Sequence, residues 1–178
     1  MMLRIVWIFM FSIIIIGCSS RKQLTATADK MEKIHAIVKM DTINIISNWA
    51  NPLNSNMIAN TGLLPVGSTA GNISLIGNAN YFKIIGDSVS IYLPYYGEWR
   101  FAPPYGARET GISFDGKPKE YKQTFNKKKN KYEYYFELKN NAEIFQINLT
   151  LFPNLNTDIH VNSNLRAYIG YRGEVIEK

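Results

Sequence analysis

Cysteine and histidine are scarce in this sequence of 178 residues. The chain has one cysteine, Cys18, and two histidines, His35 and His160. A single cysteine cannot form a disulfide within the chain, so core burial must stabilise the folded domain. These three residues show no metal-ligand spacing, and we therefore predict no metal site, no cofactor and no cysteine nucleophile. We expect both histidines to be ordinary surface residues.

The sequence also lacks an apolar run long enough to span a bilayer. Residues 5–16 form an apolar run of twelve positions after Arg4, which is the pattern of a secretory signal peptide. The run ends in Ile15-Ile16-Gly17-Cys18, which resembles the lipobox of bacterial lipoproteins. That resemblance implies cleavage before Cys18, lipid on its thiol, and attachment to a membrane through the lipid. An uncleaved anchor with a chance cysteine is the alternative.

The residues after the cysteine include no aspartate at the next position and no acidic run. By resemblance to known sorting signals, Ser19, Ser20, Arg21 and Lys22 favour the periplasmic face of the outer membrane over inner-membrane retention or surface display. We therefore expect an exported protein with a signal peptide at 1–17, a lipidated tether at 18–29 and a single globular domain at 30–178.

Acidic residues are outnumbered by basic ones, 14 to 20, and the formal net charge is +6. Residues 117–131 contain seven lysines and one glutamate, so the rest of the mature chain is close to neutral. A basic hairpin of this kind is weak evidence for nucleic acid, which we do not expect as a partner. It is either a solvated tip that deters edge pairing or a contact for anionic polymer or lipid headgroups. The candidate polyanion contacts are Lys127, Lys128, Lys129 and Lys131.

Hydrophobic periodicity predicts one helix and then many short strands. Apolar residues from Leu24 to Val38 recur at helical spacing, with Thr25 or Thr27 as the cap, and indicate an amphipathic helix packed on a sheet. Residues 54–80, rich in glycine and asparagine, indicate a long loop with a short strand near 73–76. Alternating apolar residues predict the other strands, at 43–49, 81–85, 88–93, 111–114, 119–125, 132–138, 142–152, 158–161 and 166–171.

The fold class follows from this pattern. Short strands separated by turns, including the tight Gly86-Asp87 turn, are typical of an antiparallel meander. We therefore predict an α+β fold, mainly antiparallel β, in which one N-terminal helix packs on a curved meander that closes partly toward a barrel.

Aromatic residues are concentrated between Tyr92 and Gly106. Six of these fifteen residues are aromatic, and five are proline or glycine. In a structural interpretation the rings fill the edge of the core. In a functional interpretation they form an exposed platform for a sugar, a peptide or a lipid headgroup. The candidate ligand-binding residues are Tyr95, Tyr96, Trp99, Arg100, Tyr105 and Arg108.

Four short motifs occur in a specific order along the chain. They are Gly86-Asp87-Ser88-Val89, Tyr92-Leu93-Pro94-Tyr95-Tyr96-Gly97, Ala102-Pro103-Pro104-Tyr105-Gly106 and Gly111-Ile112-Ser113-Phe114. Together they resemble an uncharacterised Bacteroidetes lipoprotein family, domain of unknown function 4251, over residues 40–176. The loop at 54–80 and the second proline, Pro104, depart from the family pattern. The resemblance implies a small exported lipoprotein fold and no known substrate.

Three functions remain open. The first is a non-enzymatic, monomeric, lipid-anchored protein that binds an envelope ligand or a protein partner through the aromatic segment. The second is a structural or assembly lipoprotein that docks on another envelope protein. The third is an envelope hydrolase, with Glu98 and Glu109 as its acid and base.

Overall fold

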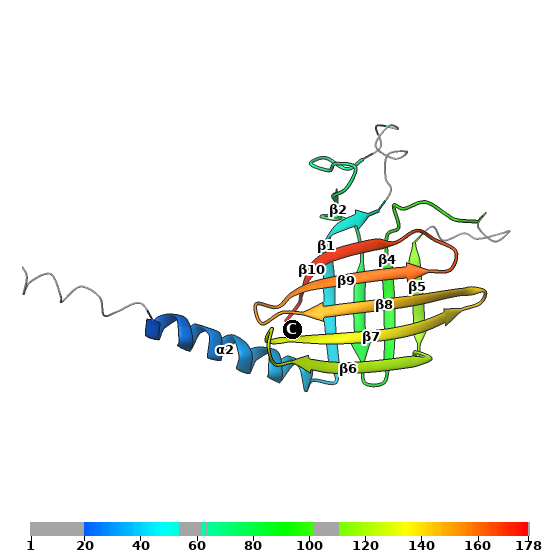
Figure 1. The fold of residues 1–178 in the computed structure, drawn as a ribbon. Coiled ribbons are helices and arrows are strands. Elements are labelled where there is room, and N and C mark those ends of the chain that lie inside the picture. Colours follow the sequence, from blue (N-terminus) through cyan, green and yellow to red (C-terminus); the bar gives the residue numbers. More distant parts are fainter. Residues whose placement is uncertain (1–19, 54–61, 63, 102–110, 178) are drawn as a thin grey trace, which may run out of the picture.

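The computed structural model describes residues 20–53, 62, 64–101 and 111–177. Within these residues it contains one helix and ten strands (Figure 1). The elements are α2 (Ser20–Val38), β1 (Thr42–Pro52), β2 (Ile73–Ser74), β3 (Tyr81–Ile85), β4 (Ser88–Leu93), β5 (Ile112–Gly116), β6 (Glu120–Asn126), β7 (Lys131–Asn140), β8 (Glu143–Leu151), β9 (Asn156–Ser163) and β10 (Ile169–Val175).

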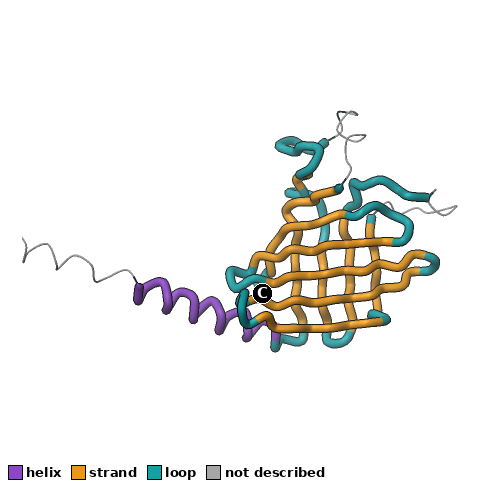
Figure 2. The backbone as a smooth tube through the Cα atoms, viewed as in Figure 1, coloured by secondary structure: helices purple, strands orange, loops and turns teal. Residues whose placement is uncertain are grey.

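All ten strands belong to one antiparallel sheet. Its order is β5-β4-β3-β1-β10-β9-β8-β7-β6, with the short β2 paired to β1. Two meanders, β3 to β5 and β6 to β10, therefore meet on the two sides of β1. Figures 1 and 2 show that the strands of one meander cross those of the other, because the sheet curls over on itself. The predicted mainly antiparallel α+β fold is confirmed.

The core lies on the inner face of the curled sheet. In β7 and β8 the burial alternates as predicted, with Phe136, Leu138, Phe145 and Ile147 at 1% exposure or less. The ring of Phe82, from β3, lies 5.5 Å from that of Phe136, which joins the two meanders across the interior. The inner face is thus filled by side chains of both halves.

Helix α2 packs its C-terminal part against one end of the sheet and begins earlier than the sequence indicated (Figure 1). It starts at Ser20, within the segment expected to be a tether, and buries Ile34 and Ile37. The expectation that His35 is an ordinary surface residue is wrong. Its Nδ1 lies 2.7 Å from the hydroxyl of Tyr132, and its ring packs edge-on against Phe125. Among the described residues, no helix is both long and apolar enough to cross a bilayer.

A bulge in β1 changes which side chains face the core. The register with β10 shifts between Ser47 and Trp49, opposite Gly173. Asn80 satisfies the backbone there, since its Oδ1 accepts from Ser47 N–H at 2.8 Å and its Nδ2 donates to Ser47 O at 2.9 Å. Without the bulge Trp49 would share the inward face of Ser47. Instead Ala50 is buried and Trp49 lies on the outer face.

The bulge depends on the missing side chain of Gly173. A Cβ there would lie 2.0 Å from the carbonyl oxygen of Ile46 and 2.6 Å from Cα of Ser47, both on the backbone. We expect Gly173→Ala to lower the free energy of unfolding by about 3 kcal/mol, because β1 and β10 must move apart. Gly71→Ala is the control, since nothing lies within 4 Å of its Cβ position. Urea denaturation of both variants measures the difference, and equal midpoints would contradict the prediction.

Candidate functional site

The aromatic turn, residues 95–100, is joined by its backbone to the connection between β9 and β10. Arg100 N–H donates to Leu165 O, and Ala167 N–H donates to Glu98 O, each at 2.8 Å. The hydroxyl of Tyr95 lies 2.8 Å from Glu98 O and 3.0 Å from Ala167 O. These contacts fix the turn at one end of the sheet.

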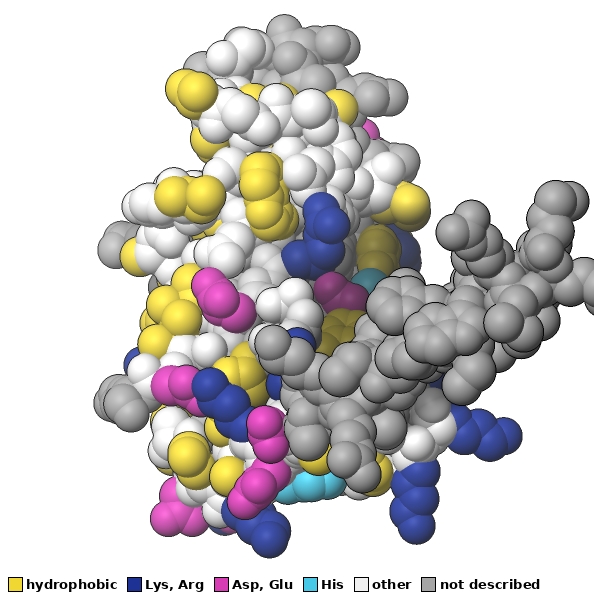
Figure 3. All heavy atoms as spheres, turned by 90° about the vertical axis from the view of Figure 1, so that its left-hand side faces the viewer, with side chains coloured by type: hydrophobic (Ala, Val, Ile, Leu, Met, Phe, Trp, Pro, Cys, Tyr) yellow, Lys and Arg dark blue, Asp and Glu magenta, His cyan; other side chains and the backbone are white. Residues whose placement is uncertain are grey.

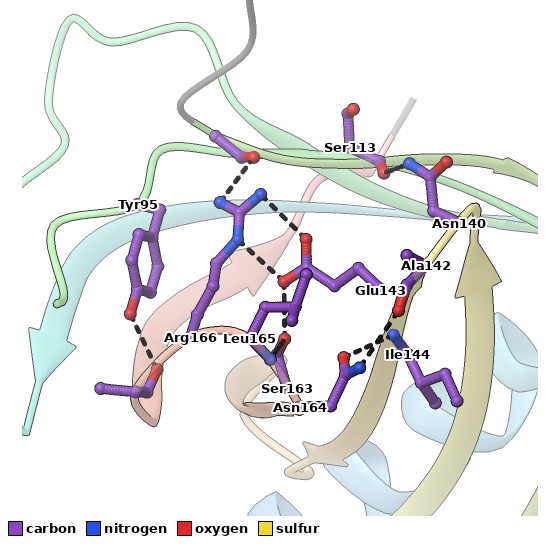
Figure 4. Close-up of polar contacts among 12 residues, drawn as sticks. Tyr95, Ser113, Asn140, Ala142, Glu143, Ile144, Ser163, Asn164, Leu165 and Arg166 are labelled. Atoms are coloured by element: carbon purple, nitrogen blue, oxygen red, sulfur yellow. Dashed lines mark hydrogen bonds and ion pairs between the residues drawn. The ribbon is translucent and has the colours of Figure 1, made fainter. Parts of the chain in front are cut away.

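Arg166 lies beneath the turn. Its guanidinium carbon is 4.0 Å from the ring centroid of Trp99 and 5.1 Å from the ring centroid of Tyr95. The guanidinium donates to both carboxylate oxygens of Glu143, from Nε at 2.9 Å and from Nη2 at 3.1 Å. Its Nη1 donates to Gly111 O at 2.9 Å (Figure 4). Arg166 therefore connects the aromatic turn with the starts of β8 and β5.

This ion pair is buried and its polar groups are satisfied. Arg166 is 6% exposed and Glu143 is 9% exposed. Glu143 Oε1 also accepts from Ser163 Oγ at 2.6 Å, as Figure 4 shows. A carboxylate that accepts three charge-assisted or hydroxyl hydrogen bonds has little capacity left to act as a base. The arrangement therefore holds the starts of β5 and β8 and the β9–β10 connection together.

Burial sets the electrostatics of the two tyrosines in the turn. It raises the pKa of Tyr95 to about 12, although the neighbouring charge of Arg166 opposes the shift. Burial also raises the pKa of Tyr96, whose hydroxyl accepts a hydrogen bond from Asn78 Nδ2 at 3.3 Å. Both rings are half-buried. They stay neutral at physiological pH and present only part of their surface to a ligand.

The structure brings together some of the residues predicted to bind a ligand. Tyr95 and Trp99 lie on Arg166, Tyr96 contacts Asn78, and Arg100 points to solvent. The remaining candidates, Tyr105 and Arg108, lie outside the described residues, as do Cys18 and Glu109.

Sequence reasoning missed Arg166 and Glu143. Arg166 is 23 residues from Glu143 along the chain, and neither belongs to a recognisable motif.

An open depression lies beside the aromatic turn, on the outer face of β8 and β9. Its volume is about 410 Å³, and its lining includes Arg100, Gln146 and Asn162. Within the described part of the chain, these three side chains make no hydrogen bond or ion pair with other residues. A guanidinium and two amides supply both donors and acceptors, so the depression suits a polar ligand.

The lysine-rich hairpin separates into paired and unpaired residues. Lys131 is 16% exposed at its side chain and pairs with Glu133 at 2.8 Å. Lys117, Lys119 and Lys122 also pair with acidic residues. Lys127, Lys128 and Lys129 are exposed in the β6–β7 turn and form no ion pair with a described residue. The contact with a polyanion through Lys127, Lys128, Lys129 and Lys131 stays a prediction.

His160, the other histidine, lies on the outer face of β9. It is exposed as expected, and its ring stacks on Tyr168 with 20° between the ring planes. Its Nδ1 contacts the hydroxyl of Tyr168. In the described ranges, no three histidine, cysteine or acidic side chains come close enough to hold a metal ion.

Comparison with known proteins identifies the family. The model of the domain of unknown function DUF4251 matches residues 25–175. The chain belongs to the DUF4251 family. The crystal structure of a DUF4251 protein from Bacteroides eggerthii is similar, with a TM-score of 0.54 and 16% sequence identity over 85% of this chain and 90% of that one. At this identity the likeness concerns the fold alone. No curated protein matches the chain.

The buried ion pair of this DUF4251 protein can be tested by removing its cation. We expect Arg166→Met to lower the free energy of unfolding by about 3 to 5 kcal/mol, because it leaves the Glu143 carboxylate buried and unpaired. Arg100→Met is the control and should change stability by no more than about 0.5 kcal/mol, since Arg100 is exposed and makes no ion pair in the described ranges. Chemical denaturation provides the measurement.

The double variant Arg166→Met/Glu143→Gln gives a second test of the same pair. It should be more stable than the sum of the two single losses indicates, because the residual buried charge is gone. Additive losses would show that the pair is not coupled.

Proposed function

We propose that this DUF4251 protein is a non-enzymatic binding protein of the bacterial envelope. Lipid on Cys18 anchors it to the outer membrane, facing the periplasm. It binds an envelope ligand with hydroxyl or amide groups, a glycan, a peptide or a lipid headgroup, at the end of the sheet that carries the aromatic turn.

The depression beside the aromatic turn is the observation that carries this proposal. Arg100 is exposed there, while the turn that bears it is fixed by two backbone hydrogen bonds to Leu165 and Ala167. A polar group held on a rigid backbone loses little conformational freedom when a ligand binds.

The alternative, an assembly protein that docks through its sheet edge, has weaker support. Strand β6 is an edge of the described sheet, and the exposed Tyr121 lies on it. However, Lys119 and Lys122 lie near or on this strand, and the three free lysines follow at its end. Charged side chains, lysine above all, are the usual means by which proteins prevent pairing at an edge.

Ligand binding at the aromatic turn can be tested with arrays of immobilised envelope glycans and peptides. We expect the mature wild-type protein to bind a subset of them and Arg100→Ala to lose at least about tenfold in affinity, because a charge-assisted hydrogen bond is removed. Lys139→Ala, which removes an exposed cation from β7, is the matched control and should bind normally. Unchanged binding by Arg100→Ala would contradict the proposed site.

The lipid anchor gives an independent prediction. In a Bacteroides host, Cys18→Ser should move the protein from the membrane fraction to the soluble fraction, because the acyl chains can no longer be attached. Metabolic labelling with a palmitate analogue should mark the wild type and not the variant. An unchanged distribution with no label in either protein would exclude the anchor.

A further inference from the structure

A tryptophan on the outer face of β1 has no evident structural partner. The bulge directs Trp49 outward, where its side chain is half-buried. Within the described part of the chain, its ring makes no aromatic or cation–π contact and its indole N–H donates no hydrogen bond. Tryptophan combines a large flat apolar surface with one donor, and in a buried structural role both are usually satisfied. The position therefore suits contact with something outside the chain.

Trp49 lines an open depression of about 260 Å³ with polar side chains around it. Arg172, its cross-strand neighbour, is held in place because Nε donates to Asn51 Oδ1 at 3.1 Å and Nη2 donates to Asn72 Oδ1 at 2.7 Å. Asp158 lies opposite Arg172 on β9, yet its carboxylate forms no hydrogen bond or ion pair with the described residues. The guanidinium of Arg172 is thus a fixed donor, and the carboxylate of Asp158 is an acceptor without a described partner. Both lie beside the partly exposed ring of Trp49.

A second depression continues the first. Asn156 and Asp158 also line a hollow of about 490 Å³ that reaches Phe152 and, on helix α2, Lys30. We call the two together the outer groove. It has an aromatic ring toward each end, Trp49 and Phe152, with amide and carboxylate groups between them. A single small ligand would occupy only part of this length, whereas a chain of linked rings would follow it.

The charges of the outer groove cancel. Its cations are Lys30 and Arg172, and its anions are Asp158 and Glu174. Figure 3, which views the molecule from the side that carries α2, shows acidic, basic and apolar side chains mixed on this face. A polyanion would meet the two carboxylates, and a cation would meet the two basic groups. The balance favours a neutral, polar ligand.

We propose that the outer groove binds a neutral oligosaccharide. A pyranose ring has one face of C–H groups, which can lie on Trp49, and a rim of hydroxyls that can donate to Asp158 and accept from Arg172. A peptide is disfavoured because the groove lies on the face of the sheet, where the backbone groups of β9 and β10 are already paired.

This site is separate from the depression beside the aromatic turn. Asp158, in the groove, and Asn162, beside the turn, are four residues apart on β9 and therefore about 13 Å from each other. The outer groove is thus a second site beyond the proposed function, and each can be tested without the other.

The test is calorimetric titration of the mature protein with neutral trisaccharides of glucose and of N-acetylglucosamine. We expect at least one to bind. Trp49→Ala and Asp158→Asn should each weaken binding by at least about tenfold, because the stacking surface or the free acceptor is lost. Trp49→Phe, which keeps a flat ring, should retain most of the affinity, and Lys139→Ala, which removes an exposed cation from β7, should bind as the wild type. Equal urea midpoints for these variants show that folding is intact.

Three results would overturn the proposal: no binding of any neutral trisaccharide, unchanged binding by Trp49→Ala, or stronger binding of a sulfated trisaccharide than of its neutral parent. The variants also separate the two sites. If Arg100→Ala abolishes binding and Trp49→Ala does not, the outer groove is excluded and the site at the aromatic turn is supported. The reverse result supports the groove, and the site at the turn is then judged by its own array experiment.

Discussion

The buried ion pair between Arg166 and Glu143 determines how the open end of this sheet is built. Burying both charges is costly unless their hydrogen bonds are complete, and here the guanidinium reaches a carboxylate, a backbone carbonyl and two aromatic rings at once. This one side chain connects the aromatic turn, which backbone hydrogen bonds hold in place, with the start of β5 and the start of β8. The polar depression that Arg100 borders exists because the turn is held in that place.

The bulge in β1 has a comparable effect on the outer face. One extra residue opposite Gly173 reverses the direction of the side chains that follow it, so that Ala50 enters the core and Trp49 leaves it. Asn80 supplies the hydrogen bonds that the irregular register leaves unmade. These two hydrogen bonds offset the backbone pairing that the bulge disrupts. The bulge in turn places the aromatic surface of Trp49 beside Arg172 and Asp158.

Much of the fold could be predicted from the sequence. In β7 and β8 apolar and polar residues alternate strictly, and the Gly86-Asp87 turn fixes the hairpin of β3 and β4, so the predicted β3 and β4 match the structure. The direction of Trp49 could not be predicted, because alternation from Ile45 places it inward and only the pairing with β10 reveals the bulge. The start of α2 was also missed, since the polar residues after Cys18 resemble a tether.

The candidate site was predicted less well than the fold. The aromatic turn stands out by composition, so Tyr95 and Trp99 could be named in advance. Their partner Arg166 could not, because a contact between residues 99 and 166 leaves no local trace in the chain. The outer groove could not be predicted for the same reason, because its residues come from β1, β9, β10, the β8–β9 turn and α2. Surfaces assembled from distant segments are visible only once register and curvature are known.

The pairing of β1 with β10 has a consequence for how the chain acquires its structure. Ile45 lies beside Val175, so the strand on which both meanders meet gains its second neighbour only when nearly the whole sequence is present. Contacts between such distant residues slow folding, since a long loop must close before they form. A chain that cannot complete its sheet until its last strand is available stays unfolded for longer, and an unfolded chain can still pass through a narrow pore. That delay suits a protein that must pass through a membrane pore before it folds, as the proposed envelope location requires.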